Sequence, residues 1–333
     1  MSAPTSGVAG ASTEDPQPHW IRSRGVPHPG RWVAIVIIAL IVIAAANSIA
    51  TNQNFRWDLV ATYFMDVLVV QGVGWTLVLT VLSMVLAIVL ALLLAVMRQS
   101  DNWILRWVSW FWVWFFRGTP VYTQLIFWGL VGVLYPKIAA GVPWGPELFS
   151  FGTTDFLNGL WPGVIGLWPA ILGLGLNESA YLAEIFRAGL KSVDGGQMEA
   201  AEALGMRKSK IMTRIILPQA MRVIVPPTGN ETIGMLKTTS LVLAVPFTFD
   251  LTFATSAIAN RIYLPIPLLI VAALWYLIIT SVLMVGQHFV EKHFGKGVDN
   301  LVPAPVAATK ATAAAHAQSE ADAAASPASG EGK

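Results

Sequence analysis

The chain has no cysteine and few charged residues. The absence of cysteine excludes disulfides, thiol nucleophiles and cysteine-based metal sites, so it gives no indication of the redox compartment. Charged residues make up 12% of the 333 residues and hydrophobic residues 55%, whereas soluble domains carry about 25% charged residues. This composition predicts an integral membrane protein with no room for a separate soluble domain.

Several nucleotide-binding and catalytic motifs are also missing. The sequence has no GxxxxGK[ST] phosphate loop, because Gly295, Lys296 and Gly297 lack both its spacing and its hydroxyl residue. It has no nucleophile elbow, HExxH metal motif or dinucleotide fingerprint. We therefore expect this chain to have no catalytic residue, metal site or cofactor, and to leave any ATP hydrolysis to another chain.

Long apolar runs predict an all-α membrane protein with about six transmembrane helices. The predicted spans are Trp32–Ala50, Val70–Met97, Val121–Tyr135, Gly163–Ile185, Val223–Val245 and Leu264–Val290. A tryptophan-rich run, Trp103–Phe116, is too short to cross and suits the headgroup layer. Arg117, Gly118, Thr119 and Pro120 then predict a break before the third span.

Lysine and arginine gather in alternate loops, which predicts the orientation. Basic residues precede the first span, follow the second and the last, and fill the central loop, so these segments and both termini should be cytoplasmic. We expect disordered cytoplasmic tails at 1–30 and 300–333, since their Ser, Gly, Pro and Ala content favours no core. The predicted order is an N-terminal helix at 31–50, then a core at 70–294 with a cytoplasmic loop at 188–220.

The central loop contains the stretch EAAEALGMRKSKIMTRIILP from Glu199 to Pro218. Its alanines and glutamates favour a short helix, Gly205 a left-handed end to that helix, and Met206–Leu217 a second, basic helical arm. The stretch resembles the cytoplasmic coupling loop of permease subunits of ATP-binding cassette importers. The matching residues, which would couple to the ATPase, are Glu199, Ala200, Ala201, Gly205, Ile215, Leu217 and Pro218. The alternative is an ordinary cytoplasmic helical hairpin.

Other segments resemble permeases of the polar amino acid uptake family. FRGTPxxxQ corresponds to Phe116–Pro120 with Gln124, AYxxEIFR to Ala180–Arg187, and PPxGN with KxTSL to Pro226–Leu241. The motif residues expected to be structural are Arg117, Gly118, Thr119, Pro120, Gln124, Glu184 and Arg187. The resemblance implies a five-helix core plus one extra N-terminal helix. It also implies ABC ATPase subunits, a second permease subunit, identical or different, and an extracytoplasmic amino-acid-binding protein as partners, with lipid around the spans and no nucleic acid.

Two acids inside predicted spans, Glu178 and Glu231, depart from the family pattern. An acid at membrane depth normally faces a cavity or a partner. We therefore place the substrate path at Asn177, Glu178, Tyr181, Asn230, Glu231, Lys237 and Thr239. The alternatives are that the two acids pair internally, for instance with Lys237, and that Glu184 and Arg187 form only an i, i+3 pair. Without the resemblance, these acids would also fit an ion-coupled secondary transporter or channel, and a membrane sensor or scaffold stays a third possibility.

Overall fold

The computed structural model describes residues 29–141 and 147–294. The tail predicted at 300–333 lies outside the described residues, as does all of the tail predicted at 1–30 except its last two residues. The described chain divides after Phe55 into two compact units. The first unit holds α1 (Pro29–Thr51) and the short 3-10 helix η1 (Gln53–Phe55).

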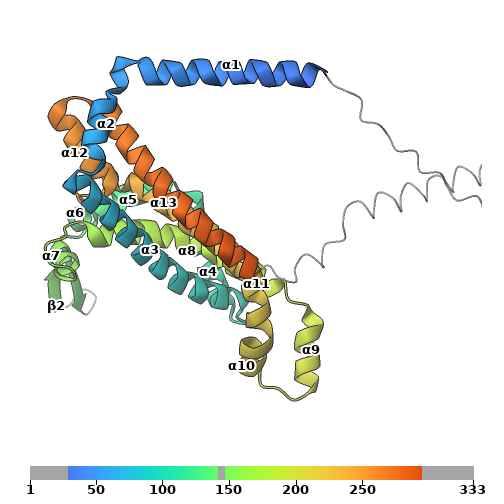
Figure 1. The fold of residues 1–333 in the computed structure, drawn as a ribbon. Coiled ribbons are helices and arrows are strands. Elements are labelled where there is room, and N and C mark those ends of the chain that lie inside the picture. The colour runs from blue at the N-terminus through green and yellow to red at the C-terminus, as the bar shows by residue number, and fades with distance from the viewer. Residues whose placement is uncertain (1–28, 142–146, 295–333) are drawn as a thin grey trace, which may run out of the picture. The chain divides into compact units, whose positions relative to one another are not determined.

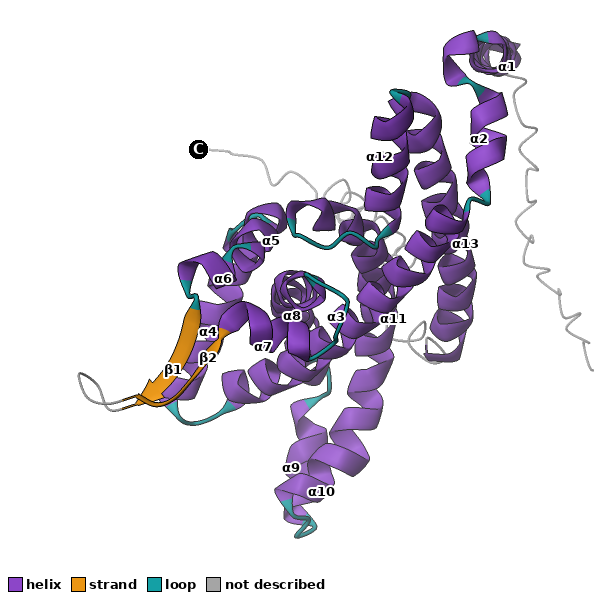
Figure 2. Cartoon of the chain, turned by 90° about the vertical axis from the view of Figure 1, so that its left-hand side faces the viewer, coloured by secondary structure: helices purple, strands orange, loops and turns teal. Residues whose placement is uncertain are grey.

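The second unit holds all the other elements, which Figures 1 and 2 show as a bundle of helices with one small hairpin. In chain order they are α2 (Trp57–Phe64), α3 (Val67–Gln99), α4 (Trp103–Gly118), α5 (Val121–Gly129), α6 (Val131–Leu134), β1 (Lys137–Gly141), β2 (Glu147–Gly152), α7 (Thr153–Gly159), α8 (Leu167–Lys191), α9 (Gly195–Ala203), α10 (Lys208–Ile211), η2 (Met212–Ile216), α11 (Leu217–Thr238), η3 (Thr239–Ala244), α12 (Leu251–Ile262) and α13 (Pro265–Phe294).

Helix α8 is the centre of this unit, since it packs against α3, α4, α5 and α11. Small residues let its neighbours approach closely. A Cβ at Gly173 would lie 2.7 Å from a methyl group of Leu125 on α5, and one at Gly175 would lie 2.8 Å from a methyl group of Leu86 on α3. The glycines therefore fix α8 tightly between α3 and α5.

Three of the predicted spans are confirmed as helices long and apolar enough to cross a membrane: Gly30–Thr51, Val67–Gln99 and Pro265–Phe294. The predicted third span is two short helices, α5 and α6, because the chain breaks again at Leu130. The predicted fifth span ends earlier as an α-helix, and its last turn is the 3-10 helix η3. The total of six spans therefore stays a prediction.

Several elements were not predicted, among them the β-hairpin, α2, α7 and α12. The segment between the predicted third and fourth spans contains an antiparallel hairpin in which Lys137 pairs with Gly152 and Ile138 with Phe151, so the fold is mainly but not entirely α-helical. The rings of Phe149 and Phe151 stack on one face of β2, and this alternation favours a strand. Helix α12 was also missed because its twelve residues are too few for a span.

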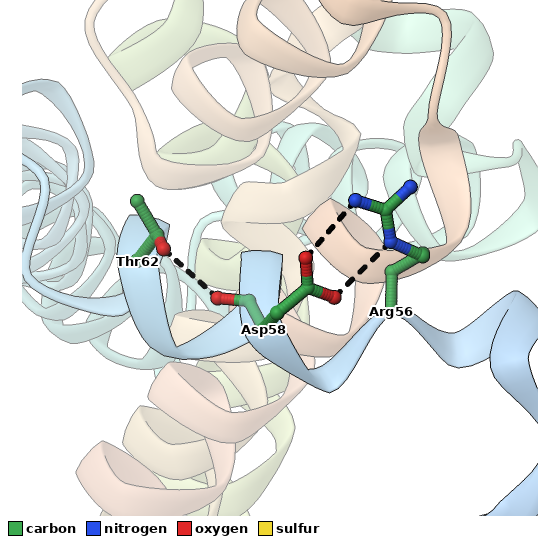
Figure 3. A network of polar contacts seen from close by, with 3 residues as sticks. All are labelled: Arg56, Asp58 and Thr62. Atoms are coloured by element: carbon green, nitrogen blue, oxygen red, sulfur yellow. Dashed lines mark hydrogen bonds and ion pairs between the residues drawn. The ribbon is translucent and has the colours of Figure 1, made fainter.

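The second unit begins with a polar turn before α2 (Figure 3). Arg56 has a left-handed backbone with φ 46°, and its guanidinium donates to both carboxylate oxygens of Asp58, at 3.1 and 3.0 Å. The hydroxyl of Thr62 donates to the main-chain carbonyl of Asp58 at 2.8 Å. The hydrogen bonds from Arg56 lower the pKa of the Asp58 carboxyl, which stays charged in the first turn of α2, where the helix dipole favours an anion.

Candidate coupling loop and substrate path

Helices α9 and α10 project together from one end of the bundle, away from the β-hairpin (Figures 1 and 2). The first arm starts at Asp194, whose carboxylate accepts from the amide of Gly196 at 2.9 Å and caps α9. Helix α8 continues to Lys191 and α11 begins at Leu217. The loop predicted at 188–220 therefore overlaps a turn of helix at each end.

The predicted glycine turn is confirmed. Gly205 has φ +73°, its amide donates to the Glu202 carbonyl at 2.9 Å, and the amide of Met206 donates to the Ala201 carbonyl at 3.1 Å. These two bonds form the Schellman end of an α-helix, which needs a left-handed residue after the last turn. The glycine therefore reverses the chain between the two arms.

A small apolar cluster holds the two arms together. Ala201 on α9 is buried against Ile211 on α10 and Ile216, so the second alanine of the motif is a packing residue. Leu204, which the sequence analysis did not single out, is 82% exposed at the tip. Among the other predicted coupling residues, Ile215 is half-buried, and Glu199, Ala200, Leu217 and Pro218 are exposed.

The second arm differs from the separate helix predicted at 206–217. Helix α10 passes through a π-helical turn, η2, directly into α11. Pro218 lies in the first turn of α11, where its missing N–H and its ring would interrupt a regular α-helical hydrogen-bond pattern, and a π-turn accommodates such a residue. The loop is therefore continuous with α11, and a force on the loop would act directly on that helix.

The motif FRGTPxxxQ forms a repaired helix break between α4 and α5. The side-chain amide of Gln124 donates to the Phe116 carbonyl at 3.0 Å, and to the Thr119 carbonyl and hydroxyl at 3.1 and 2.7 Å. Asn177 on α8 donates to the same Phe116 carbonyl at 2.9 Å. These amides replace the backbone donors lost at Pro120, as membrane-embedded helix breaks require. Asn177 is thus a structural residue in this arrangement.

The charged residues of the same motifs lie along α8. The guanidinium of Arg117 lies 5.1 Å from the ring centroid of Tyr181, a cation–π distance. Arg187 Nε donates to the Glu184 carboxylate at 2.9 Å, so the predicted i, i+3 pair is present. Tyr181 therefore contacts Arg117 at the end of α4.

Glu178 and Glu231 do come together, between α8 and α11. Their carboxyl groups lie near enough to one another for their charges to interact. Glu178 is only 8% exposed, and its Oε1 has no hydrogen-bond partner in the described part of the chain. Two facing acids in a largely buried site favour a cation or a shared proton between them.

The remaining path candidates lie elsewhere. Asn230 and Lys237 line a polar pocket of about 450 Å³ that α11 forms with α13, on a different face of α11 from Glu231. Thr239 is fully buried and donates to the Leu236 carbonyl at 2.7 Å. Within the described residues, neither Glu178 nor Glu231 forms an ion pair with Lys237, so the pairing with Lys237 that was considered from the sequence is not present.

The sequence analysis missed the contact that joins α11 to α13. Gln287 donates to the Pro226 carbonyl at 2.8 Å and to Glu291 at 3.0 Å, and it occupies the space over Gly229, where a Cβ would lie 1.7 Å from the Gln287 oxygen. The PPxGN motif alone could have suggested a close approach at Gly229, but not which residue approaches. Among the described residues, no three His, Cys, Asp or Glu side chains gather as a metal site.

Comparison with known proteins matches residues 83–296 to the family described as "Binding-protein-dependent transport system inner membrane component". The arginine transport system permease protein ArgU of Corynebacterium glutamicum is 48% identical over 288 residues, which cover 86% of this chain and 87% of ArgU. The histidine/lysine/arginine/ornithine transport system permease protein HisM of Escherichia coli is 38% identical over 213 residues, 64% of this chain and 83% of HisM.

A crystal structure of an amino acid ABC transporter with histidines has a similar fold. It is 30% identical to this chain, the TM-score is 0.54, and the match covers 68% of this chain and 94% of the other. The family match includes the candidate loop and both acids, Glu178 and Glu231. The chain therefore belongs to the family of inner membrane components of binding-protein-dependent transport systems, which are multi-pass transport subunits and not enzymes.

Proposed function

We propose that this chain is the permease subunit of an ATP-binding cassette importer and that it translocates a cationic amino acid across the cytoplasmic membrane. The observation that carries the choice of substrate is the pair of facing carboxyl groups of Glu178 and Glu231. A guanidinium or ammonium group between them would neutralise both acids and supply the donor that Glu178 Oε1 lacks. The similarity to an arginine permease supports the same choice.

The energy for transport arrives from separate ATPase subunits through the loop at 188–220. The basic residues of this loop favour the cytoplasmic side, which places the β-hairpin of 137–152 outside and both termini inside. The exposed Leu204 and Glu199 offer an apolar and an acidic contact at the tip. A second permease subunit completes the pore, and an extracytoplasmic binding protein delivers the amino acid. The family membership supports this assembly over an ion-coupled transporter.

The test is uptake of radiolabelled arginine into proteoliposomes that contain the complete importer with its ATPase and binding protein. Glu178→Gln and Glu231→Gln keep the volume and remove the charge. Because a hydrogen bond to a charged group contributes about 1.5–3 kcal/mol, we expect arginine transport to fall about 10- to 100-fold at limiting substrate in each variant. If the original importer also transports a neutral amino acid, uptake of that amino acid should not fall in either variant.

Glu291→Gln is the matched control, because this acid lies on α13 in the other pocket and an amide can still accept from Gln287. The substrate proposal is wrong if both acid variants transport arginine as the control does. The importer proposal is wrong if uptake follows an ion gradient and continues without ATP or without the binding protein.

A further inference from the structure

A long apolar groove opens on the side of the bundle between α3 and α11. Its volume is about 850 Å³, and α8 and α13 contribute to its floor. On α3 it is lined by Ile88, Leu92 and Val96, at intervals of four residues that place them along one face of the helix. The groove therefore extends along the axis of α3 and is not a local surface depression.

The two ends of the groove differ in chemistry. The inner end reaches Gln99 and Ser100, where α3 finishes, and Leu217, where α11 begins. Two exposed arginines adjoin lining residues of this end in the chain: Arg214 lies two residues after Met212, and Arg222 directly follows Met221. The exposed Lys208 and Lys210 precede them in the loop. Within the described residues none of them has a carboxylate within ion-pair distance. An apolar channel with an unpaired basic rim matches a molecule with a hydrocarbon tail and an anionic head.

We propose that this groove binds one anionic phospholipid of the cytoplasmic leaflet, with an acyl chain between α3 and α11 and its phosphate at Arg214 and Arg222. Basic pockets between spans on the cytoplasmic side are suited to such head groups. The channel runs parallel to the helices, as an acyl chain does in a bilayer. Met212 of the π-turn also lines the groove, so the lipid would contact the segment that joins the coupling loop to α11.

A second copy of the chain fits this surface less well. A symmetric interface places the same patch of both copies together, so the unpaired cations of one rim would approach those of the other. Like charges brought together in this way oppose association. The surface of the groove is also mainly apolar, with Met212 and Met221 at its inner half, although Thr228, Thr232 and Gln287 contribute to its lining. The lipid is therefore the occupant that both charge and shape favour.

The experiment titrates the purified, delipidated importer with phosphatidylglycerol or phosphatidylcholine and counts bound lipids by native mass spectrometry. We expect one phosphatidylglycerol per copy of this chain, held at least about tenfold more tightly than phosphatidylcholine, since each basic residue near the head group adds about fivefold. Arg222→Gln should reduce that preference about fivefold, and Arg261→Gln, an exposed arginine at the other end of the bundle, should not.

Two neighbouring leucines provide the steric test. Leu92 and Leu93 are 52% and 55% exposed on α3, but only Leu92 lines the groove. Leu92→Trp should therefore displace the lipid, while Leu93→Trp should retain it. Equal retention in both variants, or equal affinity of the unmodified importer for the two lipids, would overturn the proposal. So would a change in the number of permease copies with Leu92→Trp, because the groove would then be an interface between chains. The lipid count is read without transport, so it is independent of the substrate assignment.

Discussion

The side-chain amide of Gln124 donates to the main-chain carbonyl of Phe116 at 3.0 Å, across the break between α4 and α5. The two residues are eight positions apart, and between them α4 ends at Gly118 and α5 begins at Val121. Gln124 is 6% exposed, so this hydrogen bond is shielded from bulk solvent. The motif FRGTPxxxQ thus specifies both a break in a membrane-embedded helix and the side chain that repairs it.

Replacing Gln124 by leucine should destabilise the permease without removing it from the membrane. The change removes the hydrogen bonds to the Phe116 and Thr119 carbonyls, and each such bond contributes about 0.5–1.5 kcal/mol. We expect a lower thermal unfolding midpoint in detergent. Size-exclusion chromatography after heating to a series of temperatures measures this midpoint. Gln99→Leu is the control, because Gln99 donates to Ala95 within its own helix. If both variants unfold at the same temperature as the original protein, the hydrogen bonds of Gln124 do not contribute to the free energy of unfolding.

Substitutions at Gly205 test how the backbone conformation of the turn affects coupling, independently of side-chain contacts. A Cβ at this position would meet open space, so a substitution acts only through the left-handed φ of +73°. Valine is strongly disfavoured there, while asparagine tolerates this conformation. We expect Gly205→Val to lose substrate-stimulated ATP hydrolysis and Gly205→Asn to keep most of it. Equal stimulation in both variants would show that the turn geometry does not matter for coupling.

The charge of Glu199 tests the docking surface itself. This acid is exposed on α9 and forms no ion pair within the described residues, so a charge reversal does not disturb the fold of the loop. Glu199→Lys should weaken association with the ATPase, because a reversed charge opposes a complementary surface. Pull-down of the ATPase at low and high salt measures this effect. Glu202→Lys, on the same helix and also exposed, indicates whether position matters or only net charge.

Local features of the loop were predictable from the sequence, whereas its connection to the span was not. Gly205 followed from a helix-favouring run that ends in glycine, a signal contained within a few residues. The π-turn before Pro218 depends on how α10 and α11 align, and no local propensity encodes that. Pro226 and Pro227 lie inside α11, within the predicted span Val223–Val245, rather than ending the helix.

The candidate path shows where reasoning about single helices stops. Asn177, Tyr181 and Glu184 share one face of α8, as predicted from their spacing, but that face meets the end of α4. Asn230 and Lys237 share a face of α11 that turns to α13. Periodicity groups residues on a helix correctly, yet it does not tell which neighbour each face meets. Among the candidates, Glu178 and Glu231 lie near one another across α8 and α11, and their role in a substrate path stays a prediction.

Membrane orientation is open to a direct test because the chain contains no cysteine. Ser150 on β2 and Ser209 on α10 are both exposed, and cysteine is close in size to serine, so neither change should disturb the fold. With the orientation set by the basic loops, Ser150→Cys should react with an impermeant thiol reagent added to intact cells. Ser209→Cys should react only after the membrane is opened. The reverse pattern would place the loop of 188–220 outside and refute its contact with a cytoplasmic ATPase.

Gly229 and Gln287 should behave as one unit in holding α11 to α13. In Gly229→Ala the new methyl group would displace the Gln287 amide, since the present distance from a Cβ to its oxygen is 1.7 Å. The side chain can rotate away, but it then loses its bond to the Pro226 carbonyl, which contributes about 0.5–1.5 kcal/mol. Gly234→Ala is the control, because its Cβ would meet only the Glu231 carboxylate at 3.9 Å.

The distinguishing measurement is a double-mutant cycle of thermal unfolding with Gly229→Ala and Gln287→Leu. Both changes remove the same hydrogen bond, so the second should add little once the first is made, and the coupling energy should lie near the value of that bond. Additive effects would mean that Gly229 contributes through helix propensity alone, at about 1 kcal/mol in the stabilising direction for alanine. In that case Gly229→Ala would raise the unfolding midpoint, as Gly234→Ala should, rather than lower it.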